Sequence, residues 1–180
     1  MKRKIFISIN IPNKVKKRLV SAVEKWQDLP VKWTKESNLH ITLFFLGYID
    51  DESAAEVCSK VREIAENEDI FDLNMEKIEL APSADDPQMI WLIGEPSEEL
   101  RKIHEKVEKA LGMFKAERKI FRPHITLGRL RKHKWESLKE KPGISEKFQL
   151  IVPVESIDVM ASDFGDGQNE YSLIESCQLK

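Results

Sequence analysis

The sequence predicts an α+β protein with two lobes related by an internal repeat. The tetrapeptide His-Ile-Thr-Leu occurs at residues 40–43 and again at 124–127. In each half of the chain the motif follows an expected strand and an expected helix. Ile5 precedes His40 by 35 positions, and Ile90 precedes His124 by 34. This near-equality predicts a duplication with pseudo-twofold symmetry and a sheet-lined cleft between the two lobes.

The chain is expected to form one bilobal domain over residues 1–180, with repeat halves at about 1–80 and 88–180. A linker at 81–87 is rich in proline, serine and aspartate. Hydrophobic residues make up 41% and charged residues 33%, which is typical of a soluble globular domain. The net charge of -2 gives no overall basic signature for long nucleic acid, so a nucleic-acid substrate would bind at a small local site.

Cysteine content and the N-terminus bear on location. Cys58 and Cys177 are the only cysteines, which implies no disulfide framework and favours reduced thiols in the cytoplasm. The N-terminal apolar run is interrupted at Asn10 and Pro12. It is too short for a signal peptide or a membrane span, so we expect a cytoplasmic protein without membrane partners.

Periodicity and turn residues predict the elements of the first half. The expected order is a strand at 4–10, a helix at 13–27, a short strand at 31–34, the first motif strand at 39–46 ending at Gly47, a helix at 52–67 capped by Asp50 or Asp51, and a strand at 71–80. The second of these helices is expected to bury Ala55, Cys58, Val61, Ile64 and Ala65.

The second half repeats this order. The expected elements are a strand at 88–94, a helix from about Ser97 to Gly112, the second motif strand at about 120–130, a short helix at 133–140, a strand at 148–160, a turn at 165–167 and a closing strand at 171–176.

The alternation of a strand makes the repeated motif chemically informative. His40 and Thr42 point to one face, and Ile41 and Leu43 point to the other. The same alternation places His124 beside Thr126. Two such strands facing one another would hold two imidazoles and two hydroxyls around a small anion.

These residues resemble a known family. The paired His-x-Thr-x motifs are similar to those of the 2H phosphoesterase superfamily, and within it to the RNA 2′,3′-cyclic phosphodiesterases, also called the 2′-5′ RNA ligase family. Further matching features are the strand at 5–9 followed by Pro12, Trp33 and Asn38 before the first motif, Phe45-Leu46-Gly47 after it, Trp91, Phe121-Arg122-Pro123 before the second motif, Arg129, Ser162 and Tyr171.

The resemblance implies two antiparallel sheets with helices packed outside, a central cleft, and no metal or other cofactor. It implies hydrolysis of a terminal 2′,3′-cyclic phosphate to a 2′-phosphate, with His40 as proton donor and His124 as proton acceptor. The implied substrates are RNA ends, including tRNA halves, or cyclic nucleotides, and family members also join or cleave tRNA halves through 2′-5′ linkages. We expect the protein to act as a monomer.

This chemistry requires two proton transfers, because water loses a proton as it attacks phosphorus and the leaving ribose oxygen gains one. Imidazole, with an ordinary pKa of about 6.5, can do either near neutral pH. The hydroxyls of Thr42 and Thr126 can donate hydrogen bonds to the non-bridging oxygens. No motif pairs its histidine with a second metal ligand at short spacing, which disfavours a metal site.

Two basic residues compete for the phosphate. Strict alternation places Arg122 on the His124 face, whereas the resemblance favours Arg129, which needs a bulge at Gly128 to reach that face. Both residues are expected near His124, where a guanidinium charge would disfavour protonation of the imidazole and so favour its role as base. Phe44 shares the His40 face by alternation and is a candidate for stacking on a base.

Two other functions fit the sequence. One is a phosphodiesterase for 2′-5′-linked oligoadenylates or another small nucleotide. The other is a nucleotide- or RNA-binding module without catalysis, against which the two intact histidines argue.

Overall fold

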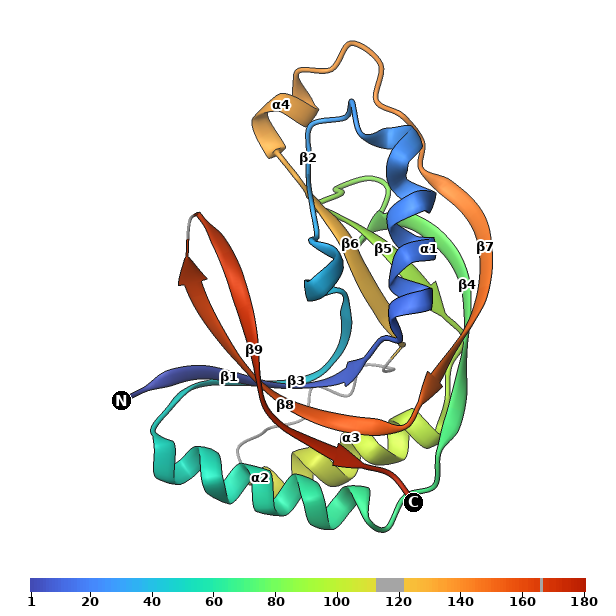
Figure 1. Ribbon diagram of the computed structural model, residues 1–180. Helices are drawn as coiled ribbons and strands as arrows, with labels where there is room; N and C mark the ends of the chain where they lie inside the picture. Colours follow the sequence, from blue (N-terminus) through green and yellow to red (C-terminus); the bar gives the residue numbers. More distant parts are fainter. Residues whose placement is uncertain (113–121, 166) are drawn as a thin grey trace.

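A computed structural model describes residues 1–112, 122–165 and 167–180, which form two antiparallel sheets flanked by helices (Figure 1). Sheet A has the strand order β3-β1-β8-β9, and sheet B has the order β2-β6-β5-β4-β7. The predicted α+β class with two antiparallel sheets is confirmed. The elements are β1 (Arg3–Asn10), α1 (Asn13–Val23), η1 (Glu24–Trp26), β2 (Val31–Trp33), η2 (Glu36–Asn38), β3 (His40–Ile49), α2 (Asp51–Ala65), β4 (Phe71–Ala81), β5 (Met89–Gly94), α3 (Glu98–Leu111), β6 (His124–Leu130), α4 (Lys132–Glu136), β7 (Ser145–Val154), β8 (Ser156–Gly165) and β9 (Gln168–Gln178).

Each sheet takes strands from both halves of the chain. Sheet A joins β1 and β3 from the first half to β8 and β9 from the second, and sheet B is mixed in the same way. The two sheets therefore do not coincide with the repeat halves at 1–80 and 88–180. The duplication itself and the single-domain assignment stay predictions.

Helices lie on the outer sides of the sheets, as expected. Figure 1 shows α2 and α3 together beneath β1, β3 and β8, and α1 beside β4 and β7. The carboxylate of Asp50 caps α2 by accepting a hydrogen bond from the Ser53 N–H at 2.8 Å. The predicted inward face of this helix was wrong at Ala55, which is exposed, because the buried stripe runs instead through Ala54 and Val57.

Two predicted strand boundaries were wrong. The first motif strand does not end at Gly47, because this glycine adopts a φ of +79° inside β3 and the strand continues to Ile49. The single strand predicted at 148–160 is two strands, since the chain leaves sheet B after Val154 and enters sheet A at Ser156. The polar pair Glu155-Ser156 lies at this crossover, between two largely apolar stretches.

Other differences are smaller. The short helix predicted at 133–140 ends at Glu136. The second motif strand begins at His124, and the part of the prediction that falls on residues 120 and 121, with Phe121 of the matching features, lies outside the described residues.

The two cysteines are buried as free thiols. Burial raises the pKa of the Cys177 thiol to about 11. Among the residues with described positions, no helix is long and apolar enough to cross a membrane.

Candidate active site

The structure brings the two motifs together across the cleft between the sheets. His40 and Thr42 on β3, and His124 and Thr126 on β6, line one pocket of about 420 Å³. Each motif buries its aliphatic pair on the opposite face of its strand, as alternation requires. The four polar side chains therefore face a common space large enough for a small ligand.

A backbone carbonyl orients each imidazole. The Nδ1 atom of His40 lies 2.6 Å from the Asn38 carbonyl oxygen, and Nδ1 of His124 lies 3.2 Å from the Arg122 carbonyl oxygen. A carbonyl only accepts hydrogen bonds, so Nδ1 carries the hydrogen in both rings. Nε2 is then the nitrogen that can gain or lose a proton, and in His40 it lies 2.9 Å from the Thr42 hydroxyl.

Aromatic rings hold the imidazoles in place. Trp91 on β5 stacks on His124 with the ring centroids 4.0 Å apart and an interplanar angle of 23°. The Tyr171 ring on β9 contacts the His40 ring edge-on, with the ring centroids 5.3 Å apart. The centroid of the Phe6 ring on β1 lies 5.1 Å from that of His40. These contacts restrict ring rotation and shield the imidazoles from water.

Burial lowers the pKa of both histidines below the ordinary value. For His40 desolvation is the largest cause, opposed by the hydrogen bond to Asn38 and reinforced by the positive charges of Lys16 and His124. For His124 desolvation again dominates, opposed by the hydrogen bond to the Arg122 carbonyl. The expectation that arginines next to His124 distinguish the two histidines was wrong, because the buried lysine of α1 acts on His40 instead. The charges near the two histidines therefore do not show which histidine acts as the base.

The structure separates the two arginine candidates. Arg129 lines the histidine pocket. A register shift between Ile90 and Trp91 of β5 leaves Leu127 without a partner opposite it. The bulge therefore lies at Leu127 and not at Gly128 as predicted, and it turns Arg129 to the motif face. The Arg122 guanidinium instead donates to the Gly94 carbonyl and pairs with Glu76, both at 3.2 Å. Strict alternation was wrong for Arg129 because the bulge at Leu127 resets the alternation beyond it. It was wrong for Arg122 because this residue precedes β6, which begins at His124, and its guanidinium is held by Gly94 and Glu76.

A similar bulge changes the phenylalanine candidate. In the β1–β3 pair, Ser8 faces Thr42 and Ile7 faces Phe44, so the extra residue is Leu43. The Phe44 side chain therefore shares the face of Ile7, although it also borders the pocket, and its ring lies 6.3 Å from that of His104 on α3. Phe45, opposite Phe6 and 61% exposed, is the phenylalanine on the His40 face. Strand alternation predicted Phe44 as the candidate for base stacking and did not identify Phe45.

Sequence reasoning also missed supporting polar groups. The Thr34 hydroxyl donates to the Thr126 carbonyl at 2.9 Å, and the Asn38 amide donates to the Asn169 carbonyl at 3.0 Å. Both residues line the pocket. Thr34 had no sequence signal beyond proximity to the first motif, and Asn38 was noted only as a residue that matches the family. In the part of the chain that the structure describes, no three His, Cys, Asp or Glu side chains are grouped so as to hold a metal ion.

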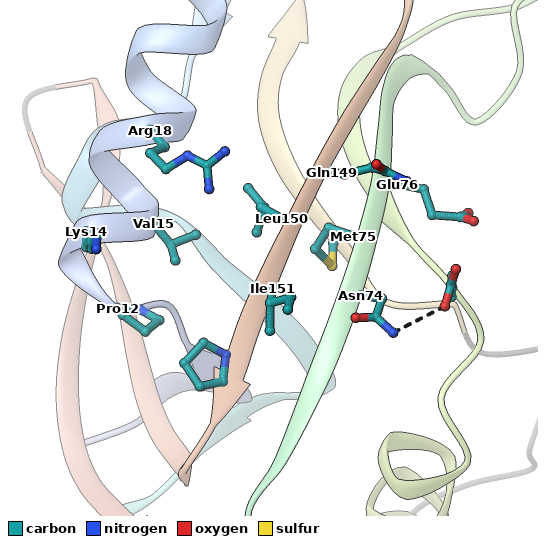
Figure 2. A pocket seen from close by; sticks show the side chains of 12 residues that line it. Pro12, Lys14, Val15, Arg18, Asn74, Met75, Glu76, Gln149, Leu150 and Ile151 are labelled. Carbon is teal, nitrogen blue, oxygen red and sulfur yellow. Dashed lines mark hydrogen bonds between the residues drawn. The ribbon is translucent and has the colours of Figure 1, made fainter.

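A second cavity of about 710 Å³ lies between α1 and the strands β4 and β7. Figure 2 shows Val15 and Arg18 of α1 facing Leu150 and Ile151 of β7. This cavity shares no lining residue with the histidine pocket. None of the predicted site residues lies there.

The protein has two antiparallel sheets, and one pocket contains both of its His-x-Thr-x motifs. This combination defines a class of proteins with two histidines in one site. The family model of the 2′-5′ RNA ligase superfamily matches residues 14–166. The chain belongs to this superfamily, which confirms the resemblance found in its motifs.

Individual relatives agree with this assignment, and solved structures share the fold. The RNA 2′,3′-cyclic phosphodiesterase of Thermotoga maritima is 29% identical over 97% of this chain and 95% of its own length. The Bacillus subtilis protein of the same name is 27% identical over 88% of this chain and 84% of its own length. The crystal structure of TT0787 of Thermus thermophilus aligns with a TM-score of 0.82 at 22% identity, covering 98% of this chain and 97% of that one. E. coli LigT complexed with 3′-AMP aligns with a TM-score of 0.77 at 22% identity, covering 99% of both chains.

Proposed function

We propose that this protein hydrolyses terminal 2′,3′-cyclic phosphates of RNA, or of cyclic nucleotides, to leave a 2′-phosphate and a 3′-hydroxyl. The observation that carries this proposal is the presence of two imidazoles in one pocket, each with Nδ1–H donating to a carbonyl and Nε2 left for proton transfer. The names of relatives that match most of the chain support the same activity. The cytoplasmic location and the monomeric state remain predictions.

In the proposed mechanism, Nε2 of His124 takes a proton from the attacking water, and Nε2–H of His40 gives a proton to the leaving O3′. This division of roles follows the family resemblance. Each proton transfer contributes about 10²- to 10⁴-fold in rate. The hydroxyls of Thr42 and Thr126 donate to the non-bridging oxygens, the Arg129 guanidinium offsets their charge, and Phe45 stacks on the terminal base.

The test is incubation with adenosine 2′,3′-cyclic phosphate, with the 2′- and 3′-phosphate products resolved. We expect the 2′-phosphate alone, and a rate at least about 10²-fold lower for His40→Ala and for His124→Ala. Binding without turnover would favour the non-catalytic module. Cleavage of 2′-5′-linked oligoadenylate alone would favour the small-nucleotide alternative.

The superfamily also suggests ligation as a second candidate. A ribose 5′-hydroxyl can replace water as the nucleophile, since His124 would deprotonate either one and O3′ would leave in both cases. The product would then be a 2′-5′ phosphodiester. Adding an RNA with a 5′-hydroxyl to the hydrolysis assay tests whether this linkage forms.

Metal independence is a separate prediction of the two-histidine mechanism. Hydrolysis should continue at an unchanged rate after dialysis against EDTA, because both proton transfers use protein side chains. The same dialysed sample is assayed with and without added Mg²⁺ or Mn²⁺. Activity that is lost with EDTA and restored by either ion would contradict the mechanism.

A further inference from the structure

We propose that the cleft face of sheet A, beyond the histidine pocket, binds the single-stranded RNA that precedes the cyclic phosphate, with bases stacked on its exposed aromatic side chains. The proposal rests on the proposed function, since it extends the substrate from one nucleotide to a short oligonucleotide. We call this surface the stacking face, and define it by Lys4, Phe45, Tyr48, Tyr171 and Leu173.

Strand register places these side chains on one face. Directly paired residues on antiparallel strands point to the same side of a sheet. Phe45 pairs with Phe6, which contacts His40, and Tyr48 pairs with Lys4, two residues before Phe6 on β1. The bulges in β3 therefore put both aromatic residues on the histidine side.

The other half of the stacking face comes from β9. Lys4 and Tyr171 both pair with Ser162 of β8, and the Tyr171 ring also lies 5.0 Å from Phe6. Leu173 follows Tyr171 on the same side of β9. The stacking face thus crosses all four strands of sheet A.

This surface is unusually apolar for one that contacts solvent. Tyr48 is 72% exposed, Phe45 61% and Leu173 56%. Figure 1 shows α2 and α3 on the opposite side of sheet A, where they cover its buried face. Exposed aromatic side chains on an open sheet are the usual platform for the bases of single-stranded nucleic acid.

Continuity with the pocket and charge favour RNA over another occupant. Phe45 and Tyr171 line the histidine pocket as well as the stacking face. Lys4 is exposed beside Tyr48, whereas Asp163 and Glu170 of the β8–β9 hairpin point to the other side by alternation. Same-face residues two positions apart on a strand are about 7 Å apart, comparable to one step of an extended RNA strand.

The test compares adenosine 2′,3′-cyclic phosphate with a tetranucleotide that ends in the same cyclic phosphate. We expect kcat/KM for wild type to be about tenfold or more higher on the tetranucleotide, given the strength of base stacking on aromatic side chains. Tyr48→Ala with Leu173→Ala should remove most of this advantage without changing turnover of the mononucleotide. Ile151→Ala, at a 58% exposed position on β7 of sheet B, is the matched control and should keep the advantage.

Charge is tested separately by fluorescence anisotropy of a labelled tetranucleotide at several salt concentrations. Lys4→Gln should weaken binding and make its salt dependence shallower, whereas Lys102→Gln on α3 should not. Equal turnover of the two substrates by wild type, or an advantage that survives in the double variant, would overturn the stacking face and leave the proposed function intact. Failure to hydrolyse either substrate would overturn both. If the double variant bound the tetranucleotide as tightly as wild type, and a protein bound to the stacking face, this face would be assigned to a protein partner instead.

Discussion

At the residue scale, one backbone carbonyl decides which nitrogen of each histidine can do chemistry. The carbonyls of Asn38 and Arg122 stand two residues before their histidines, and both accept from Nδ1. The two motifs therefore hold their histidines in the same tautomer. Because the tautomer is the same in both, it leaves the division of roles to be measured.

The roles can be measured with leaving groups of different acidity. A phosphodiester with an aryl leaving group of low pKa needs little protonation on departure. His40→Ala should therefore be partly rescued on an aryl substrate relative to a ribose substrate, and His124→Ala should stay impaired on both. Rescue of His124→Ala instead would reverse the two roles.

The two arginines give a matched pair of variants. Arg129→Gln should lower kcat/KM by about 10²- to 10³-fold, because it removes a charged donor from the phosphate pocket. Arg122→Gln should leave kcat/KM nearly unchanged and cost about 1–2 kcal/mol of stability, because its pair with Glu76 is solvent-exposed and its bonds to the Gly94 carbonyl are only partly buried. Steady-state kinetics and urea denaturation measure the two effects. A larger kinetic loss at Arg122 would restore the assignment that strict alternation suggested.

At the element scale, bulges decide which side chains reach the pocket. The extra residues Leu43 in β3 and Leu127 in β6 each move the following side chain to the other face. Gly128, directly after the second bulge, lies against β2. A Cβ at Gly128 would lie 2.5 Å from Val31 Cγ1 and 3.1 Å from Trp33 Cε3.

Gly128→Ala should therefore destabilise the protein by about 1–3 kcal/mol, because neither neighbour is the free end of a flexible chain. It should also lower activity, since β2 and the Arg129 backbone must shift. Gly143→Ala is the control, because a Cβ at Gly143 meets nothing within 4 Å. Urea denaturation of both variants is the measurement. Equal stability of the two variants would show that β2 can move away from the added methyl group without loss of stability.

At the scale of the whole molecule, closing two sheets over the motifs makes the imidazoles difficult to protonate. Desolvation is the largest cause of the lowered pKa of His40, of His124 and of His104 on α3. An unfolded imidazole has a pKa of about 6.5, so below this pH the unfolded chain binds more protons than the folded protein. The stability contributed by the neutral imidazoles is therefore present above a pH of about 6.5 and is lost as the pH falls through that value toward the folded pKa values.

We expect the melting temperature of wild type to fall between about pH 7.5 and about pH 5.5. The fall should be smaller in the His40→Gln/His124→Gln double variant, which has lost two of the three groups responsible. Differential scanning calorimetry at several pH values measures the difference. Parallel curves for the two proteins would mean that the folded and unfolded pKa values of these histidines are equal.

The sequence by itself determined the class and the core of the candidate site. Strand alternation in the two copies of His-Ile-Thr-Leu placed His40 with Thr42 and His124 with Thr126. The spacing of apolar residues predicted most strands and helices. These properties depend on neighbours within a few residues, so a single sequence contains them.

Only the tertiary structure decided which residues complete the pocket. It selected Arg129 over Arg122 and Phe45 over Phe44, because bulges are defined by the partner strand and not by the strand itself. It divided residues 148–160 between two sheets, since the alternation of a strand does not say which sheet the strand joins. It also placed Lys16, 24 positions from His40 in sequence, close enough to affect the pKa of that histidine. Contacts between distant segments determine the register of paired strands and the charges that surround each histidine. Local periodicity carries no information about these contacts.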